Sequence, residues 1–201
     1  SSPLAACLAL LAAWGVVGLA GLLRPRSVEF AGRTLFPLGA LCGLALAVVA
    51  VRSIALPPEQ VQLLIGLPDL PFHMRLDPLA AVFLALLGAA SAGISVFSAG
   101  YFRQGEGALP GLLCLEYHLF LASMGLVVLA DDAYAFTVAW ETMALSSYFL
   151  VTTQHRIPDI RRAGFLYLLI AHLGAIGILL SFGVMQGGSW LFTFDAMRAA
   201  Q

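Results

Sequence analysis

Six apolar segments, each about long enough to cross a lipid bilayer as a helix, dominate this sequence. They cover roughly residues 3–23, 34–56, 78–101, 111–130, 133–153 and 162–186. Inside lipid, every backbone polar group must find its partner within the chain, and a helix achieves this within a single segment. The sequence therefore predicts an all-α integral membrane protein with six transmembrane helices.

Composition supports the same class and excludes others. The chain is 61% hydrophobic and only 10% charged, whereas a soluble domain carries about 25% charged residues. Its net charge of −1 argues against nucleic-acid binding, which needs a clustered basic surface. Cys7, Cys42 and Cys114 lie far apart inside apolar runs. We therefore expect neither an iron–sulfur cluster nor a zinc ion on this chain.

The connections between the apolar segments divide the chain into five parts. Residues 1–56 hold two N-terminal helices, and residues 57–76 form a proline-punctuated surface connection that suits a short hairpin. Residues 77–130 hold helices three and four, and residues 131–186 hold helices five and six. Residues 187–201 are a polar segment, and we expect the whole to be the N-terminal piece of a longer polypeptide.

Arginine counts predict the orientation, because cytoplasmic connections are enriched in basic residues. Seven arginines fall in the odd-numbered connections: Arg24, Arg26, Arg33, Arg103, Arg156, Arg161 and Arg162. Three fall on the opposite side: Arg52, Arg75 and Arg198. We expect the odd-numbered connections in the cytoplasm and the N-terminus outside. Asp131 and Asp132 then form a solvated outer turn between two antiparallel helices.

Glu141 is an acidic residue in the middle of the fifth apolar segment. A charge there costs roughly 2.5–3.5 kcal/mol on insertion scales, and such residues usually mark proton or ion routes. Tyr134, Thr137 and Tyr148 share its helix face and provide a polar stripe. A low-dielectric surrounding favours the protonated carboxyl group, so Glu141 is a candidate for taking up and releasing a proton. A purely structural, hydrogen-bonding role is the alternative.

His172 is the second candidate for proton transfer. At 1.5 Å rise per residue, Glu141 lies about 12 Å and His172 about 15 Å into their helices, so both are near the midplane. His172 is then a candidate proton relay, or it simply bonds a helix backbone. Glu116 and His118 lie about 6–9 Å below the cytoplasmic surface. They are candidates for proton entry, or interfacial residues that reach water.

Four stretches resemble one membrane-protein superfamily. Residues 139–151, Ala-Trp-Glu-Thr-Met-Ala-Leu-Ser-Ser-Tyr-Phe-Leu-Val, resemble the motif around the key glutamate of antiporter-like subunits. Residues 74–80, 121–132 and 162–174 agree with it. Such subunits occur in respiratory complex I, in Mrp-type sodium/proton antiporters and in membrane-bound hydrogenases. Within this superfamily the resemblance is greatest to hydrogenase-4 component B and its formate hydrogenlyase relatives.

The resemblance implies a fold of roughly fourteen helices with broken helices in its half-channels, of which this chain would be the N-terminal part. Glu141 aligns with a glutamate that the superfamily couples to a lysine on the seventh helix, and this chain contains no lysine. It also implies partner subunits that carry iron–sulfur, nickel-iron or flavin centres. The implied location is the cell membrane, or inner membrane, of a bacterium or archaeon.

The expected function is a membrane subunit of a redox-driven, proton-translocating complex of the hydrogenase-4, formate hydrogenlyase or NADH-quinone oxidoreductase type. The chain itself would be a non-redox subunit of an oxidoreductase complex. An Mrp-type sodium/proton antiporter subunit is the alternative, with sodium in place of, or beside, the proton. A scaffold without a transport role is a third hypothesis. A haem cytochrome with His118 and His172 as axial ligands is disfavoured, since their depths differ by about 6 Å.

Overall fold

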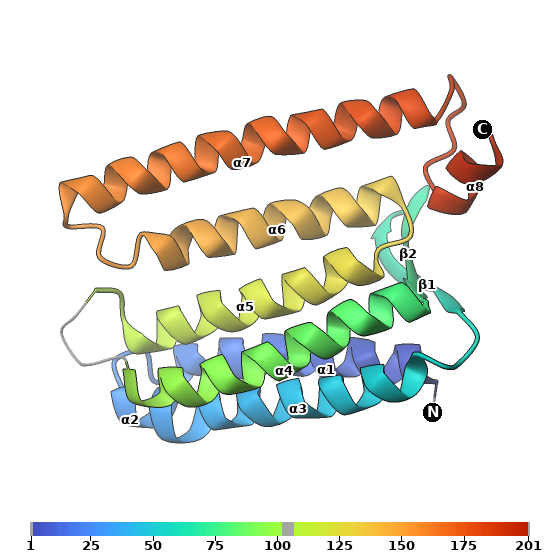
Figure 1. Cartoon of the computed structure of the whole chain (residues 1–201). Coiled ribbons are helices and arrows are strands. Elements are labelled where there is room, and N and C mark those ends of the chain that lie inside the picture. Colours follow the sequence, from blue (N-terminus) through green and yellow to red (C-terminus); the bar gives the residue numbers. More distant parts are fainter. Residues whose placement is uncertain (1, 102–106, 201) are drawn as a thin grey trace.

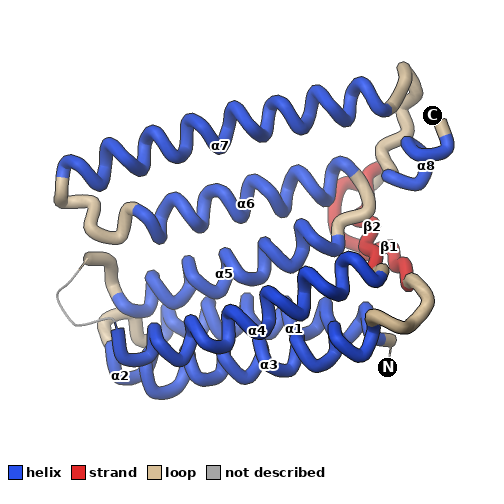
Figure 2. The backbone as a smooth tube through the Cα atoms, viewed as in Figure 1, coloured by secondary structure: helices blue, strands red, loops and turns tan. Residues whose placement is uncertain are grey.

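The computed structural model describes residues 2–101 and 107–200. Long helices lie side by side along a common axis and form a bundle, with a small hairpin at one end (Figure 1). The long helices are α1 (Pro3–Ala20), α3 (Phe36–Ser53), α4 (Pro78–Tyr101), α5 (Pro110–Leu129), α6 (Ala133–Val151) and α7 (Pro158–Met185). Short helical pieces are η1 (Gly21–Leu23), α2 (Val28–Phe30), η2 (Ala31–Leu35) and α8 (Phe194–Ala199). Figure 2 shows that the hairpin is the one strand-containing part of the described chain.

The described helices include five that are long and apolar enough to cross a membrane. They are Pro3–Leu23, Val28–Ser53, Pro78–Tyr101, Pro110–Leu129 and Pro158–Met185. The helix α6 is not among them, because its 19 residues include Glu141 and several hydroxyl side chains that lower its hydropathy. The predicted helical membrane fold is therefore present, but the count of six spans is not confirmed.

The second membrane helix begins earlier than its apolar pattern predicts. The sequence predicts residues 34–56, whereas the helical stretch runs from Val28 to Ser53. Its first turns include the π-helical segment η2, which ends just before Pro37. Proline has no N–H to bond the carbonyl one turn earlier, and the wider π turn relieves this mismatch.

Close backbone contact joins α3 to α4. A Cβ atom added at Gly43 would lie 2.8 Å from the carbonyl oxygen of Gly88, and one added at Gly88 would lie 2.5 Å from that of Gly43. Small residues at such positions allow helices in membranes to approach closely. Trp14 of α1 joins the same group, since its indole N–H donates to the carbonyl of Gly39 at 3.0 Å.

The connection after α3 folds as an antiparallel hairpin of β1 (Glu59–Leu67) and β2 (Leu70–Leu76). The pairing shifts between Leu63 and Gly66, and Gly66 has a φ of 125°, which glycine adopts without strain. The hairpin lies at the end of the bundle where both chain ends lie (Figure 1). An isolated bridge from Met74 to Ala130 ties β2 to the end of α5.

The turn between α5 and α6 is buried, which corrects the expectation of a solvated turn. Asp131 is 7% exposed and Asp132 is fully buried. The backbone N–H of Asp131 donates to the carbonyl of His73 at 2.9 Å, and that of Phe194 donates to the carbonyl of Asp131 at 3.0 Å. The hairpin and the start of α8 thus cover a turn that the sequence alone places in water.

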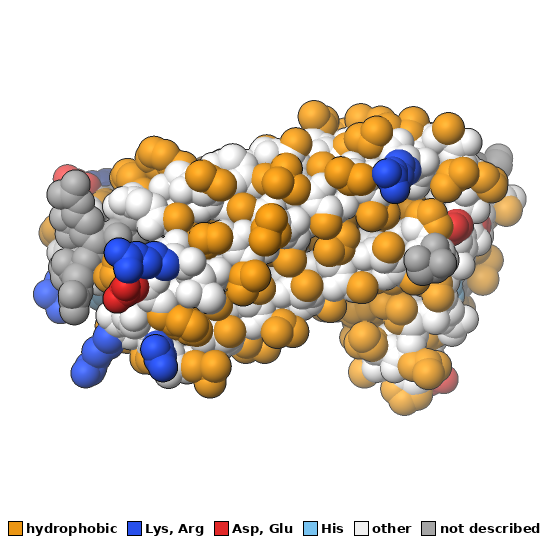
Figure 3. Space-filling view, turned by 90° about the horizontal axis from the view of Figure 1, so that it is seen from below, with side chains coloured by type: hydrophobic (Ala, Val, Ile, Leu, Met, Phe, Trp, Pro, Cys, Tyr) orange, Lys and Arg blue, Asp and Glu red, His pale blue; other side chains and the backbone are white. Residues whose placement is uncertain are grey.

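The arginines separate between the two ends of the bundle. The end that holds α2 and the α6–α7 turn carries Arg24, Arg26, Arg33, Arg156, Arg161 and Arg162, and the hairpin end carries Arg52, Arg75 and Arg198. Arg103, which the orientation argument also uses, lies outside the described residues. In the view of Figure 3, most of the basic side chains lie near one end, another lies toward the opposite end, and apolar side chains are spread along the bundle. This is the distribution expected of a chain whose flanks face lipid.

Candidate functional site

The structure brings Glu141 and His172 together between α6 and α7. Oε2 of Glu141 lies 3.4 Å from Nε2 of His172. Each residue is near the middle of its helix, and their side chains are 34% and 47% exposed. The separation is an ion-pair contact slightly longer than an ordinary hydrogen bond. The two residues that the depth argument placed at the same height therefore face each other.

The backbone assigns the protonation pattern of the His172 ring. Nδ1 of His172 lies 2.9 Å from the carbonyl oxygen of Leu168, one turn earlier in α7. A carbonyl only accepts hydrogen bonds, so we assign the hydrogen to Nδ1. In the neutral ring Nε2 is then a bare acceptor, and it faces the carboxyl group of Glu141. A proton can pass between these two atoms over a short distance.

A second polar contact crosses the same pair of helices. The hydroxyl groups of Ser147 on α6 and Tyr167 on α7 lie 2.5 Å apart. Ser147 is six residues beyond Glu141, about 9 Å along the helix. Sequence reasoning missed both residues, although the available signal was a serine in the glutamate motif and a tyrosine five residues before His172.

The other end of the α6–α7 contact is aromatic. Phe136 meets Phe182 edge to face, with ring centroids 5.5 Å apart. We use the name α6–α7 seam for four of the residue pairs in contact here: Phe136–Phe182, Glu141–His172, Ser147–Tyr167 and Thr152–Gly164. The ionisable pair lies within the seam, with neutral contacts on both sides of it.

The predicted polar stripe does not bond to Glu141. The hydroxyl of Thr137 donates to the carbonyl of Ala133 in its own helix at 2.7 Å. The ring of Tyr134 packs edge to face on Phe72 of the hairpin, with centroids 5.5 Å apart. Tyr148 lies seven residues, or about two turns, beyond Glu141, and its ring is next to Gly164 of α7. Within the described residues no hydrogen bond joins these side chains to Glu141, so their part in proton transfer stays a prediction.

Glu116 and His118 are both buried in α5, at 9% and 0% exposure. Residues two apart project from different sides of a helix, so the structure does not bring the two side chains together. Nδ1 of His118 lies 2.8 Å from the carbonyl of Cys114. The ring lies against Gly39 of α3, and the Cβ of His118 lies against Gly18 of α1. Within the described residues Glu116 Oε2 and His118 Nε2 have no hydrogen-bond partner.

These positions bear on two hypotheses. A role of Glu116 and His118 in proton entry stays a prediction. His118 faces α1 and α3, whereas His172 faces α6 from α7. This arrangement does not suit axial ligation of one haem by the two histidines.

The hairpin end of the site carries a charged cluster. Burial raises the pKa of Asp131, the nearby carboxylate of Asp195 adds to this rise, and Arg75 and Arg198 oppose it. The hydrogen bond from Arg198 lowers the pKa of exposed Asp195. Asp132 accepts from the backbone N–H of His73 at 2.7 Å. The cluster thus connects the hairpin, the start of α6 and α8.

Residues 2–101 and 107–200 contain no group of three or more His, Cys, Asp or Glu side chains that could hold a metal ion. No family model matches the sequence.

Each of three curated relatives matches about two thirds of the chain. An uncharacterized protein of Mycobacterium tuberculosis is 37% identical over 142 residues, which are 67% of this chain and 22% of that protein. Hydrogenase-4 component B of Escherichia coli is 33% identical over 125 residues, which are 62% of this chain and 18% of that protein. NADH-quinone oxidoreductase subunit L of M. tuberculosis is 29% identical over 133 residues, which are 64% of this chain and 21% of that protein.

Solved structures extend the likeness over nearly the whole chain. A chain of the Mrp complex from Dietzia sp. superposes with a TM-score of 0.74 at 25% identity, covering 95% of this chain and 20% of that chain. The chain is a homologue of antiporter-like membrane subunits. A chain of the membrane-bound sulfane sulfur reductase, an archaeal respiratory membrane complex, shares the fold with a TM-score of 0.76 at 16% identity. The match covers 95% of this chain and 29% of that chain.

This antiporter-like chain spans about a fifth of the length of the curated relatives it matches. With five candidate spans and homologues among membrane complexes, it is a multi-pass membrane protein. The resemblance of residues 139–151 to the glutamate motif and the comparisons agree on the superfamily.

Proposed function

We propose that this chain is part of a membrane subunit that moves protons across the bilayer in a redox-driven complex. The complex would be of the hydrogenase-4, formate hydrogenlyase or NADH-quinone oxidoreductase type. The observation that carries the proposal is the contact between Glu141 and His172, two ionisable groups 3.4 Å apart in the middle of neighbouring helices. The homology to hydrogenase-4 component B and to NADH-quinone oxidoreductase subunit L supports the type of complex.

The proposed proton step runs from carboxyl to imidazole. Glu141 takes up a proton, and Nε2 of His172 accepts it from Oε2, which leaves a carboxylate beside an imidazolium. Attraction between these opposite charges is strong in a low-dielectric surrounding and offsets part of the cost of forming them there. The carbonyl of Leu168 holds Nδ1–H throughout, so the ring keeps Nε2 directed at Glu141. Loss of the Nε2 proton to a neighbouring acceptor leaves a neutral His172 and an anionic Glu141, which can then take up the next proton.

The remaining predicted residues have supporting roles in this proposal. Glu116 and His118 would admit protons from the arginine-rich end, and Tyr134, Thr137 and Tyr148 would hold water along α6. Ser147 and Tyr167 extend the polar line from the ionisable pair toward the arginine-rich end. Iron–sulfur, nickel-iron or flavin centres on partner subunits would supply the driving reaction.

The decisive experiment replaces Glu141 by Gln in the full-length protein within its complex. We expect proton uptake into inverted membrane vesicles, followed with a pH-sensitive dye, to be abolished while the complex still assembles. A control is Glu29→Gln, the same chemical change at an exposed glutamate that pairs with Arg33. Unchanged proton uptake in Glu141→Gln would contradict the proposal, and loss of assembly alone would favour the scaffold hypothesis.

A second candidate function is an Mrp-type sodium/proton antiporter subunit. The likeness to a chain of the Mrp complex, with a TM-score of 0.74 at 25% identity, favours it. The same carboxyl chemistry would serve both functions, so the driving force separates them. Proton movement that needs a sodium gradient and no electron donor, together with rescue of a salt-sensitive strain, would establish the antiporter. Proton movement that needs an electron donor would establish the redox-driven subunit.

A further inference from the structure

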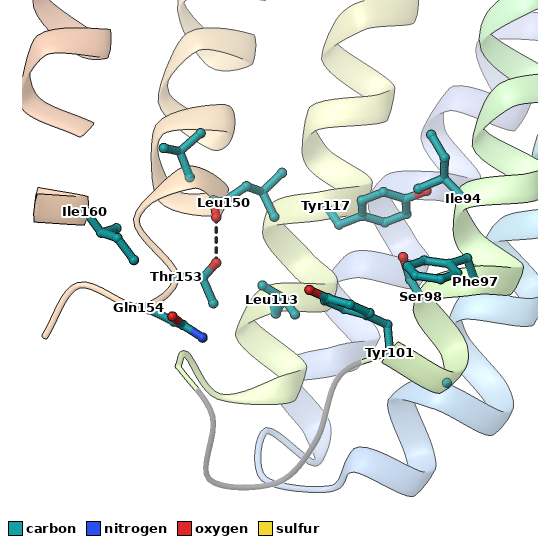
Figure 4. Close-up of a pocket in the computed structure, with 12 residues that line it drawn as sticks. Ile94, Phe97, Ser98, Tyr101, Leu113, Tyr117, Leu150, Thr153, Gln154 and Ile160 are labelled. Carbon is teal, nitrogen blue, oxygen red and sulfur yellow. Dashed lines mark hydrogen bonds between the residues drawn. The ribbon is translucent and has the colours of Figure 1, made fainter. Parts of the chain in front are cut away.

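A cavity of about 990 Å³ opens at the arginine-rich end of the bundle, between α4, α5, the end of α6 and the start of α7. Figure 4 shows its walls: Ile94, Phe97 and Tyr101 come from α4, Leu113 from α5, and Leu150 from α6. Ile94 and Tyr101 are seven residues apart, so the cavity follows α4 for about 10 Å. It lies outside the α6–α7 seam, which contributes none of its lining residues.

The walls of this cavity are mainly apolar. Ile94, Phe97, Leu113 and Leu150 contribute hydrocarbon surface, while two of the hydroxyl-bearing residues are already bonded within the protein. The Tyr117 hydroxyl lies 2.9 Å from that of Ser95. The Thr153 hydroxyl donates to the carbonyl of Leu150 at 2.6 Å, as drawn in Figure 4. Such a space accepts a hydrocarbon chain more readily than a polar molecule.

The mouth of the cavity is basic. A second hollow of about 480 Å³ shares Thr153 and Gln154 with the cavity and is also lined by His155 and Arg156. The guanidinium of Arg161 donates to the carbonyls of His155 at 3.0 Å and of Arg156 at 3.4 Å, which holds it at this turn.

The charges of this turn do not balance. Residues 152–162 include Arg156, Arg161 and Arg162, and their one carboxylate is Asp159. The exposed arginines therefore leave a net positive charge beside an apolar cavity.

We propose that this cavity binds a phospholipid with an anionic phosphodiester headgroup. One acyl chain lies along α4 between Phe97 and Leu150, and the phosphate lies at the mouth near Arg156 and Arg161. Basic pockets between membrane helices on the cytoplasmic side suit anionic headgroups, and guanidinium groups form strong charge-assisted hydrogen bonds to phosphate oxygens. The cavity lies at the helix ends, where a headgroup meets the bilayer surface. The proposal does not depend on the proton step.

The first test compares headgroups. Full-length protein in a neutral detergent is titrated with dioleoyl phosphatidylglycerol and with dioleoyl phosphatidylcholine, and bound lipid is counted by native mass spectrometry. We expect phosphatidylglycerol to bind roughly tenfold more tightly. The double variant Arg156→Gln/Arg161→Gln should remove this preference, and Arg52→Gln at the opposite end should keep it. Equal affinities for the two lipids, an unchanged double variant, or displacement by millimolar inorganic phosphate would overturn the proposal.

The second test fills the cavity. Ile94→Trp places a larger side chain on the cavity wall, and Val96→Trp places the same side chain on an exposed position of α4 outside it. We expect Ile94→Trp to weaken binding of phosphatidylglycerol at least tenfold and Val96→Trp to leave it unchanged. Equal binding by both variants would show that lipid binds elsewhere or that another part of the full-length protein occupies the cavity, and it would overturn the proposal.

Discussion

Asp132 is a fully buried carboxylate whose two oxygens serve different elements. Oδ1 accepts from the backbone N–H of Ala135 at 2.6 Å and caps α6. Oδ2 accepts from the backbone N–H of His73 at 2.7 Å and lies 3.1 Å from Nδ1 of the same residue. One side chain thus sets where α6 begins and holds the hairpin against it.

Replacing Asp132 by Ala should destabilise the protein strongly. Loss of a helix cap costs about 1 kcal/mol, and a buried N–H left without an acceptor costs about 1–3 kcal/mol more. Thermal unfolding of the purified protein measures the effect. Asp69→Ala, at the exposed hairpin turn, is the matched control and should have little effect. Equal melting temperatures for the two variants would contradict the role given to Asp132.

The burial of Asp131 leads us to expect that the stability of the fold depends on pH. Burial raises the pKa of its carboxyl in the folded chain above the ordinary value of 3.8. A group with a raised folded-state pKa stabilises the fold below its ordinary pKa, and this contribution disappears as the pH rises through the folded-state pKa. Asp131→Asn should therefore melt at a higher temperature than the unchanged protein at pH 7, and the difference should shrink near pH 4. A difference that grows toward low pH would contradict this assignment.

At the scale of residues, helix periodicity and depth were sufficient to predict which two ionisable side chains lie at the same height. Counting residues from the helix ends placed Glu141 and His172 at one height, and the structure brings them into contact. It could not find Ser147 and Tyr167, because their contact depends on how α7 is rotated against α6. Asp132 was expected in water, since no local pattern shows that the distant hairpin covers it.

At the scale of elements, the α3–α4 pair has the closest backbone approach described above, through Gly43 and Gly88. Two glycines of α4 provide a matched comparison, because a Cβ at Gly88 would meet backbone atoms of α3, whereas one at Gly93 would meet nothing within 4 Å. Only the glycine on the face of α4 that packs against α3 is needed for the close contact; a glycine elsewhere on α4 is not.

Gly88→Ala should separate α3 from α4 and destabilise the protein by about 1–3 kcal/mol, as overpacking does in other cores. Gly93→Ala should be neutral or stabilising, since alanine favours a helix over glycine by about 1 kcal/mol. Thermal unfolding of the two single variants measures both effects. A melting temperature for Gly88→Ala equal to or above that of Gly93→Ala would show that the contact can relax without cost.

Element boundaries followed the sequence unevenly. The start of α4 at Pro78 agrees with the predicted segment 78–101, and the carboxylate of Asp77 caps this end by accepting from the N–H of Ala80 at 2.8 Å. The early start at Val28 was not visible, because residues 28–33 are less apolar than the segment they extend. The helix α6 was expected to span the membrane. Its polar residues, including Glu141, lower its hydropathy, so it is not among the five candidate spans.

At the scale of the whole molecule, the segregation of arginines predicts which end faces the cytoplasm. Leu64 in the hairpin is fully exposed at one end, and His155 is exposed in the α6–α7 turn at the other. In a background with Cys7, Cys42 and Cys114 replaced by Ala, Leu64→Cys should react with an impermeant maleimide on intact cells. His155→Cys should react only after permeabilisation. The opposite labelling pattern would invert the proposed orientation.

The α6–α7 seam has a mechanical consequence for the molecule. Its aromatic and hydroxyl contacts hold the two helices with a strength that does not change with ionisation. The attraction between Glu141 and His172 does change, because it is greatest when one carries a negative and the other a positive charge. Under the proposed proton step, each proton gained or lost would therefore strengthen or weaken this one contact between α6 and α7, while the neutral contacts on both sides of it stay the same.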